Sequence, residues 1–129
     1  MENECRQPTA VERSLLERIL EAEFSGRDEL APLLRSVIVR NIDEDCGLEL
    51  ESQVQGKAPV TKRIPVDAEG KDEDGVAIHM LLHVVEGRPV ELEFFREDGA
   101  TVRKVPAPSA FDLIVLPPGP PGGFRGANS

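Results

Sequence analysis

The segment between residues 76 and 97 alternates apolar and polar side chains on either side of a short break, and this pattern restricts the possible folds more than any other part of the chain. The two halves read VAIHMLLHVV and PVELEFFRE, and the letters EGR separate them. Successive side chains of a strand point to opposite faces of a sheet, so each half can turn an apolar side toward a core. The sequence therefore predicts two antiparallel strands that form a hairpin.

The pairing register of this hairpin can be predicted by matching apolar side chains. A loop with an even number of residues would set Leu82 opposite Glu91 and place a carboxylate among aliphatic side chains, which is costly. A loop of three residues, 86–88, instead places Leu82 opposite Leu92. The other pairs expected in this register are Met80 with Phe94, Val84 with Val90, His83 with Glu91, Leu81 with Glu93, and His79 with Phe95.

A third strand is expected after this hairpin. Asp98 and Gly99 form a dipeptide that is typical of tight hairpin turns, and ATVRKV follows it at residues 100–105. In this meander, the further expected pairs are Glu93 with Lys104, Phe95 with Val102, and Leu92 with Val105. The second face of the sheet would then carry His79, His83, Glu91, Glu93 and Lys104, with Leu81, Val85, Phe95 and Val102 among them.

The N-terminal part of the chain has helical spacing instead. In PTAVERSLLERILEAEF, residues 8–24, apolar side chains recur at helical intervals, Thr9 can cap the helix and Glu12 completes a capping box. RDELAPLLRS, residues 27–36, is expected to form a second, shorter helix. From residue 37 the period changes, and residues 37–54 predict a hairpin that is rich in β-branched residues.

Three further segments complete the predicted domain. VTKRIPVDA, residues 60–68, is expected to be a strand at a sheet edge, because Pro65 has no N–H to donate. EGKDEDG, residues 69–75, is expected to be an acidic loop. APSAFDLIVL, residues 107–116, fits either a last strand or a helical turn followed by a strand.

These elements predict an α+β fold, in which two N-terminal helices pack on a mainly antiparallel sheet of about five to six strands, a hairpin plus a meander. We expect a single domain over residues 9–116, preceded by an N-terminal extension, residues 1–8. Residues 117–129 are rich in proline and glycine and nearly free of charge, so a disordered tail is expected there.

Charge and composition narrow the classes of partner and compartment. The chain has 24 acidic and 15 basic residues, a net charge of −9, and this field repels nucleic acid and anionic membrane surfaces. A basic protein partner is favoured, although an acidic excess also serves solubility alone. Neither a leader peptide nor an apolar run of about 18 residues is visible, and Cys5 and Cys46 lack metal-ligand spacing, so we expect a cytoplasmic protein with reduced thiols.

Catalytic and metal-binding patterns are weak. On a strand, His79 and His83 would point the same way but stand about 13 Å apart, which is too far for joint metal coordination. His83 and Glu91 could exchange a proton, but no nucleophile with an orienting group accompanies them. The acidic loops DEDCG and DEDG do not match the spacing of a calcium-binding EF-hand. We therefore assign no catalytic residue, no metal ligand and no cofactor from the sequence.

The stretch LLHVVEGRPVELEFFREDG, with DEDGV before it and LLERILEAEFSGRDEL near the N-terminus, resembles a group of small bacterial proteins that share a domain of unknown function. The resemblance covers roughly residues 9 to 116. Some similar small acidic bacterial domains act as immunity proteins that neutralise basic toxins, so the resemblance brings that class into consideration. It assigns no catalytic residue.

The resulting first hypothesis is a non-enzymatic protein-binding module that presents an acidic sheet face to a basic partner, with His83, Glu91, Glu93 and Phe95 as the candidate contacts. A second hypothesis is an enzyme or small-molecule-binding protein with a pocket near His83 and Glu91. A third is a homo-oligomer built through the same face. The sequence leaves the oligomeric state open.

Overall fold

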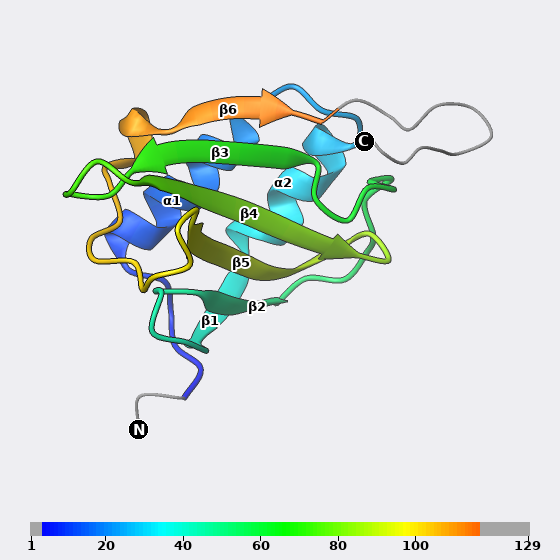
Figure 1. Ribbon diagram of the computed structural model, residues 1–129. Helices are drawn as coiled ribbons and strands as arrows, with labels where there is room; N and C mark the ends of the chain where they lie inside the picture. Colours follow the sequence, from blue (N-terminus) through cyan, green and yellow to red (C-terminus); the bar gives the residue numbers. More distant parts are fainter. Residues whose placement is uncertain (1–3, 117–129) are drawn as a thin grey trace.

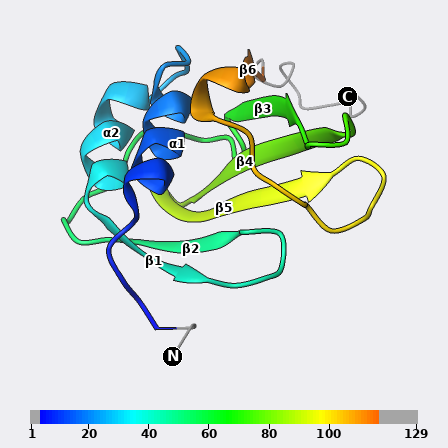
Figure 2. The ribbon, with the colours of Figure 1, turned by 90° about the vertical axis from the view of Figure 1, so that its left-hand side faces the viewer.

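A six-stranded antiparallel sheet forms the centre of the computed structural model, which describes residues 4–116, and two helices cover one of its faces (Figures 1 and 2). The strand order is β1-β2-β5-β4-β3-β6. This is the predicted α+β fold; the proposed tail, residues 117–129, lies outside the described residues. The elements are α1 (Ala10–Leu20), α2 (Arg27–Arg35), β1 (Val37–Asn41), β2 (Leu48–Ser52), β3 (Val66–Lys71), β4 (Ala77–Val85), β5 (Arg88–Arg96), the 3₁₀ helix η1 (Pro108–Ala110) and β6 (Asp112–Val115).

The start of α1 is fixed by the predicted capping box. The backbone N–H of Glu12 donates to the Thr9 hydroxyl, and the backbone N–H of Thr9 donates back to the Glu12 carboxylate. These two bonds satisfy donors that the first helical turn would otherwise leave free.

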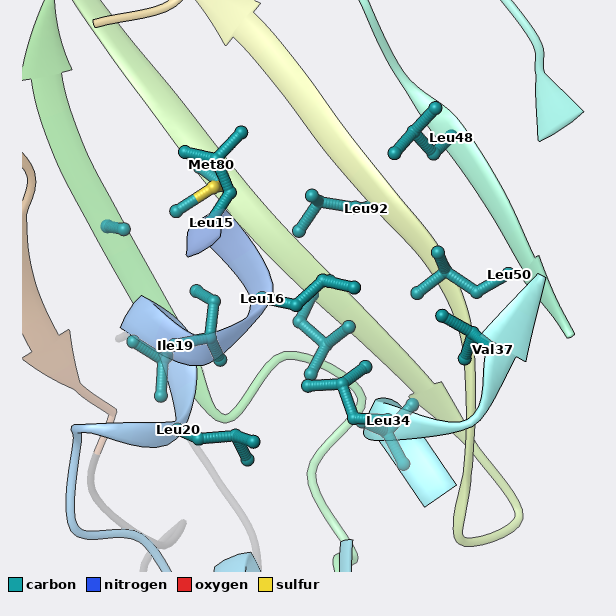
Figure 3. Close-up of a cluster of buried hydrophobic side chains, with 14 of the residues drawn as sticks. Leu15, Leu16, Ile19, Leu20, Leu34, Val37, Leu48, Leu50, Met80 and Leu92 are labelled. Atoms are coloured by element: carbon teal, nitrogen blue, oxygen red, sulfur yellow. The ribbon is translucent and has the colours of Figure 1, made fainter. Parts of the chain in front are cut away.

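The core lies between the helices and the sheet (Figure 3). Each helix turns one apolar stripe toward the strands, as its helical spacing predicts. Met80 and Leu92 are fully buried beneath these stripes and come from neighbouring central strands. The buried helical residues are Leu15, Leu16, Ile19 and Leu20 of α1 and Leu30, Leu33 and Leu34 of α2.

The β4–β5 hairpin has the predicted register over most of its length but a different turn. Leu82 lies opposite Leu92, as apolar matching predicts. The turn, however, consists of Glu86 and Gly87, with φ angles of 52° and 78°, as in the two-residue turns that suit the twist of a hairpin. The predicted three-residue loop at 86–88 is therefore wrong.

A β-bulge reconciles this two-residue turn with the apolar register. Val84 lies opposite Pro89 and His83 lies opposite Glu91, so Val90 is an additional residue on β5. The bulge shifts the pairing by one residue, which returns the apolar side chains beyond it to the core face. The predicted pair of Val84 with Val90 is therefore wrong, and the pairs farther from the turn are confirmed.

On the side away from β4, β5 pairs with β2 and not with residues 100–105, the segment that was expected to form the third strand of the meander. Leu48 lies opposite Leu92, and Glu49 lies opposite Glu91. Residues 100–105 form no strand. The predicted pairs of Glu93 with Lys104, Phe95 with Val102, and Leu92 with Val105 are therefore wrong.

A buried carboxylate explains why this segment is not a strand. Asp72 accepts hydrogen bonds from the backbone N–H groups of Arg103 and Lys104, at 2.7 and 2.8 Å. Consecutive N–H groups of a strand point to opposite sides, so one carboxylate cannot bind both while the chain stays in a ladder.

The edge position predicted for the proline-containing segment is also wrong, because β3 lies between β4 and β6. β3 begins at Val66, directly after Pro65, so the missing proline N–H falls outside the ladder. β3 also extends to Lys71 and includes residues that were expected in the acidic loop. At the C-terminal end, η1 and β6 match the alternative of a helical turn followed by a strand.

Candidate functional site

Both helices lie on one side of the sheet (Figure 2). The opposite face of the sheet carries the polar side chains of the strands. No helix lies on this face in the part of the chain that the structure describes. We call it the open face. Its strand side chains are Ile38, Arg40, Glu49, Glu51, Asp67, Glu69, Lys71, Ala77, His79, Leu81, His83, Val85, Arg88, Glu91, Glu93, Phe95, Asp112 and Ile114.

Cross-strand register arranges these side chains in rows, because directly opposed residues of neighbouring strands share a face. One row crosses β1, β2, β5 and β4 as Arg40, Glu49, Glu91 and His83. A second crosses β5, β4, β3 and β6 as Phe95, His79, Glu69 and Asp112. Between them lie Glu93, Leu81, Asp67 and Ile114.

Two different partners fix which ring nitrogen of His83 carries a proton. The Nε–H of Arg63 donates to Nδ1 of His83 at 2.9 Å, and Nε2 of His83 lies 2.7 Å from a carboxylate oxygen of Glu93. Because a guanidinium group can only donate, Nδ1 carries no proton, and Nε2 donates its proton to Glu93. His83 thus lies opposite Glu91, as predicted, but its hydrogen-bond partner is the diagonal neighbour Glu93.

His79 has two carboxylate partners instead. Nδ1 lies 2.7 Å from Asp67 and Nε2 lies 2.6 Å from Glu97. Ionised carboxylates can only accept, so this arrangement favours a ring with protons on both nitrogens, an imidazolium. Burial alone would lower the pKa of His79, but the hydrogen bonds to Asp67 and Glu97 outweigh burial and raise it above its usual value.

Phe95 contributes an apolar surface beside this histidine. Its ring stacks on the His79 ring, with centroids 4.9 Å apart and planes 12° from parallel. An aromatic face attracts a cation, so the contact stabilises the imidazolium form of His79. Phe95 remains 36% exposed and is available to a partner.

The candidate residues His83, Glu91, Glu93 and Phe95 therefore share one face, with His83, Glu91 and Glu93 close together and Phe95 beside His79. The sequence did not indicate Arg63, Asp67 or Glu69 as neighbours of the histidines. The usable signal was the alternation in VDAEGK, residues 66–71, which places Asp67 and Glu69 on one face.

A surface hollow beside the β4–β5 turn bears on the predicted pocket. Its volume is about 390 Å³, and neither His83 nor Glu91 lines it. The residues around it are Leu50, Glu51, Ser52, Lys57, Val85, Glu86, Arg88, Pro89 and Val90. This hollow therefore gives no support to a pocket built on His83 and Glu91.

A family model for a domain of unknown function (DUF6984) matches residues 5–106. The chain belongs to this family. The predicted resemblance to a domain of unknown function is thereby confirmed. No curated protein and no solved structure matched the chain. The matched part of this DUF6984 protein contains both helices and β1 to β5, and with them most of the open face.

One structural observation concerns whether a helix of the protein could cross a membrane. Neither helix in the described part of the DUF6984 protein has the length and apolar character that crossing a membrane requires.

Proposed function

We propose that this DUF6984 protein is a protein-binding module whose open face binds a basic region of a partner protein. The observation that carries the proposal is the charge of that face. Its carboxylates outnumber its guanidinium and ammonium groups: Glu49, Glu51, Asp67, Glu69, Glu91, Glu93 and Asp112 stand against Arg40, Lys71, Arg88 and Arg63, the last of which reaches the face at His83. Such a concentration of one sign steers a partner of the opposite sign toward the face.

The distribution of apolar groups supports the same proposal. Phe95 and Ile114 are 36% and 47% exposed, and they lie among the carboxylates rather than in the core. Protein interfaces combine aromatic and aliphatic contacts with a polar rim. A basic partner that also presents apolar side chains would complement both features.

Internal pairing leaves part of the charge free for a partner. Glu93 is bound to His83, and Glu49 pairs with Arg40. Glu91 and Glu69 have no hydrogen-bond or ion-pair partner within the described residues, and they lie on either side of the two histidines. Arginine is the natural partner for them, because its planar fork binds a carboxylate through two hydrogen bonds.

The experiment is a titration of the isotopically labelled protein with an arginine-rich peptide, followed by NMR. We expect the largest shift changes at Glu91, Phe95 and Leu81. The double variant Glu91→Lys/Glu93→Lys should bind the peptide at least about tenfold more weakly than the unaltered protein.

The matched control is Glu23→Lys/Glu29→Lys, which changes the net charge equally at exposed positions on the helical side. We expect this control to change peptide affinity by less than about threefold at physiological ionic strength, because charges farther than a Debye length are screened. An equal loss of peptide affinity in the two double variants would overturn the proposal, since binding would then depend only on the net charge of the protein.

A further inference from the structure

Two clusters with the same chemical composition lie on the open face. Glu69, His79 and Glu97 form one cluster, and His83, Glu91 and Glu93 form the other. In each, one ring nitrogen and two carboxylate oxygens lie within 4.8 Å of one another. Histidine nitrogen together with carboxylate oxygen is a donor set that Zn²⁺ and similar divalent ions bind, often with three protein ligands and an open fourth position.

The second ring nitrogen distinguishes the two clusters. A histidine that binds a metal through one nitrogen almost always donates the other N–H to a carboxylate, a carbonyl or water, which fixes the ring. His79 meets this requirement, because Nδ1 lies 2.7 Å from Asp67 while Nε2 points to Glu97.

His83 does not meet the requirement. Arg63 donates to Nδ1 of His83, so the ring proton stays on Nε2, the nitrogen that faces Glu93. A metal ion on Nε2 would move the proton to Nδ1, where it would confront the N–H donor of Arg63. The cluster around His83 is therefore unsuited to a metal in this arrangement.

We propose that Glu69, Nε2 of His79 and Glu97 bind a divalent transition-metal ion of the Zn²⁺ class, with Asp67 orienting His79 through Nδ1–H. On binding, the Nε2 proton leaves to solvent and the nitrogen lone pair takes the metal, while Nδ1–H stays on Asp67. The ion thereby replaces one proton by two positive charges among the carboxylates of Asp67, Glu69 and Glu97.

The geometry needs little adjustment. The His79 side chain is 12% exposed and its ring is stacked on Phe95, so the nitrogen donor is held in place. Metal bonds of about 2.0–2.1 Å at a tetrahedral angle separate two donor atoms by about 3.3 Å. Glu97 lies 2.6 Å from Nε2 and must withdraw slightly. Its side chain is 54% exposed and follows the end of β5, so it is free to do so.

The experiment uses the full chain, with Zn²⁺ titrated by calorimetry and Co²⁺ as a spectroscopic probe. We expect saturable binding of one ion and visible Co²⁺ absorption bands of a site with nitrogen and oxygen ligands. His79→Gln should weaken Zn²⁺ binding at least about tenfold, and Asp67→Asn should weaken it about 10- to 100-fold.

His83→Gln is the matched control, because it removes the other histidine of the same face. We expect it to change the Zn²⁺ affinity by less than about threefold, since Arg63 already occupies its Nδ1. Should His79→Gln fail to fold, Glu97→Gln replaces it, because this exposed carboxylate can be neutralised without disturbing the buried ring. Absence of saturable Zn²⁺ binding would overturn the proposal. An equal loss of Zn²⁺ affinity in the His79 and His83 variants would also overturn it.

Discussion

Asp72 and Arg96 form an ion pair inside the protein, with a guanidinium nitrogen of Arg96 2.9 Å from a carboxylate oxygen of Asp72. Their side chains are 0% and 3% exposed, and Asp74 and Asp98 complete the shell around the guanidinium group. The last residue of β5 thus places a positive charge among the carboxylates of the acidic turn after β3. The Asp72 carboxylate also accepts hydrogen bonds from the backbone of Arg103 and Lys104, in the segment that leads to η1.

Replacing Arg96 should therefore be strongly destabilising. Arg96→Met leaves the Asp72 carboxylate buried without its counter-charge, and breaking one side of a buried ion pair is among the most costly substitutions. We expect the thermal denaturation midpoint to fall by at least about 10 °C, measured by circular dichroism. The control is Arg40→Met, which breaks an exposed ion pair with Glu49 and should shift the midpoint by less than about 3 °C. Equal shifts would show that the buried cluster has no special role.

The same cluster predicts a loss of stability in acid. Burial would raise the pKa of Asp72, but the N–H groups of Arg103, Glu73 and Lys104 and the guanidinium of Arg96 hold it well below its usual range. Arg96 and the backbone N–H of Ala100 likewise lower the pKa of Asp98 to about 2. An unfolded aspartate titrates near pH 3.9.

Because both pKa values are lower in the folded state, the stabilisation is complete above about pH 4 and is lost as the pH falls toward about 2. Urea denaturation midpoints measured between pH 7 and pH 2 should fall steeply in this range. In Asp72→Asn, the midpoint should be lower at pH 7 but should depend less on pH. Asp112→Asn, at an exposed position, should keep the slope of the unaltered protein. A slope unchanged in Asp72→Asn would contradict this account.

Gly87 provides a test of the turn between β4 and β5. Its φ angle is +78°, and a Cβ atom there would lie 2.6 Å from the carbonyl oxygen of Ala58. We expect Gly87→Ala to lower the free energy of unfolding by at least about 2 kcal/mol, because it combines backbone strain with a clash.

Gly99→Ala separates these two effects. Gly99 also has a positive φ, +81°, but a Cβ atom there meets nothing within 4 Å. Strain alone should cost about 1–2 kcal/mol in this variant, as judged from urea denaturation. If both alanine variants lost the same free energy, the contact between Gly87 and Ala58 would be irrelevant to stability.

The sequence predicted those parts of the fold in which only one arrangement keeps carboxylates out of the core. Leu82 had to face Leu92, whatever the turn between them. The two-residue turn shifts the pairing by one residue relative to the predicted three-residue loop, and the bulge shifts it back. The predicted register was therefore right beyond the bulge, although the predicted loop was wrong. The neighbour of β5 could not be deduced in this way, because Leu48 and Val105 offer Leu92 equally suitable apolar partners.

The candidate site was predictable to the same extent. His83 and Glu91 come from one hairpin, so their proximity followed from its register. Asp67 approaches His79 from β3, and Arg63 approaches His83 from the segment before β3. No local pattern in the sequence reveals which strand neighbours β4. The opposite hydrogen-bonding of the two histidines is a consequence of tertiary structure alone.

The charge of the open face also predicts how the protein behaves alone. In a symmetric dimer the same patch contacts its own copy, so carboxylates of one open face would meet those of the other. Like charges in contact cost several kcal/mol unless they are compensated. A homo-oligomer built through this face is therefore disfavoured, and we expect a monomer of 14.1 kDa by sedimentation velocity at micromolar concentration in low salt.

Salt and a substitution distinguish the possible outcomes of that measurement. Screening weakens repulsion, so any association through the open face should increase with ionic strength. Phe95→Ser would weaken such association, because it removes an exposed aromatic ring of the open face. A stable dimer in low salt that Phe95→Ser dissociates would mean that the open face binds a second copy of the chain and not a basic partner.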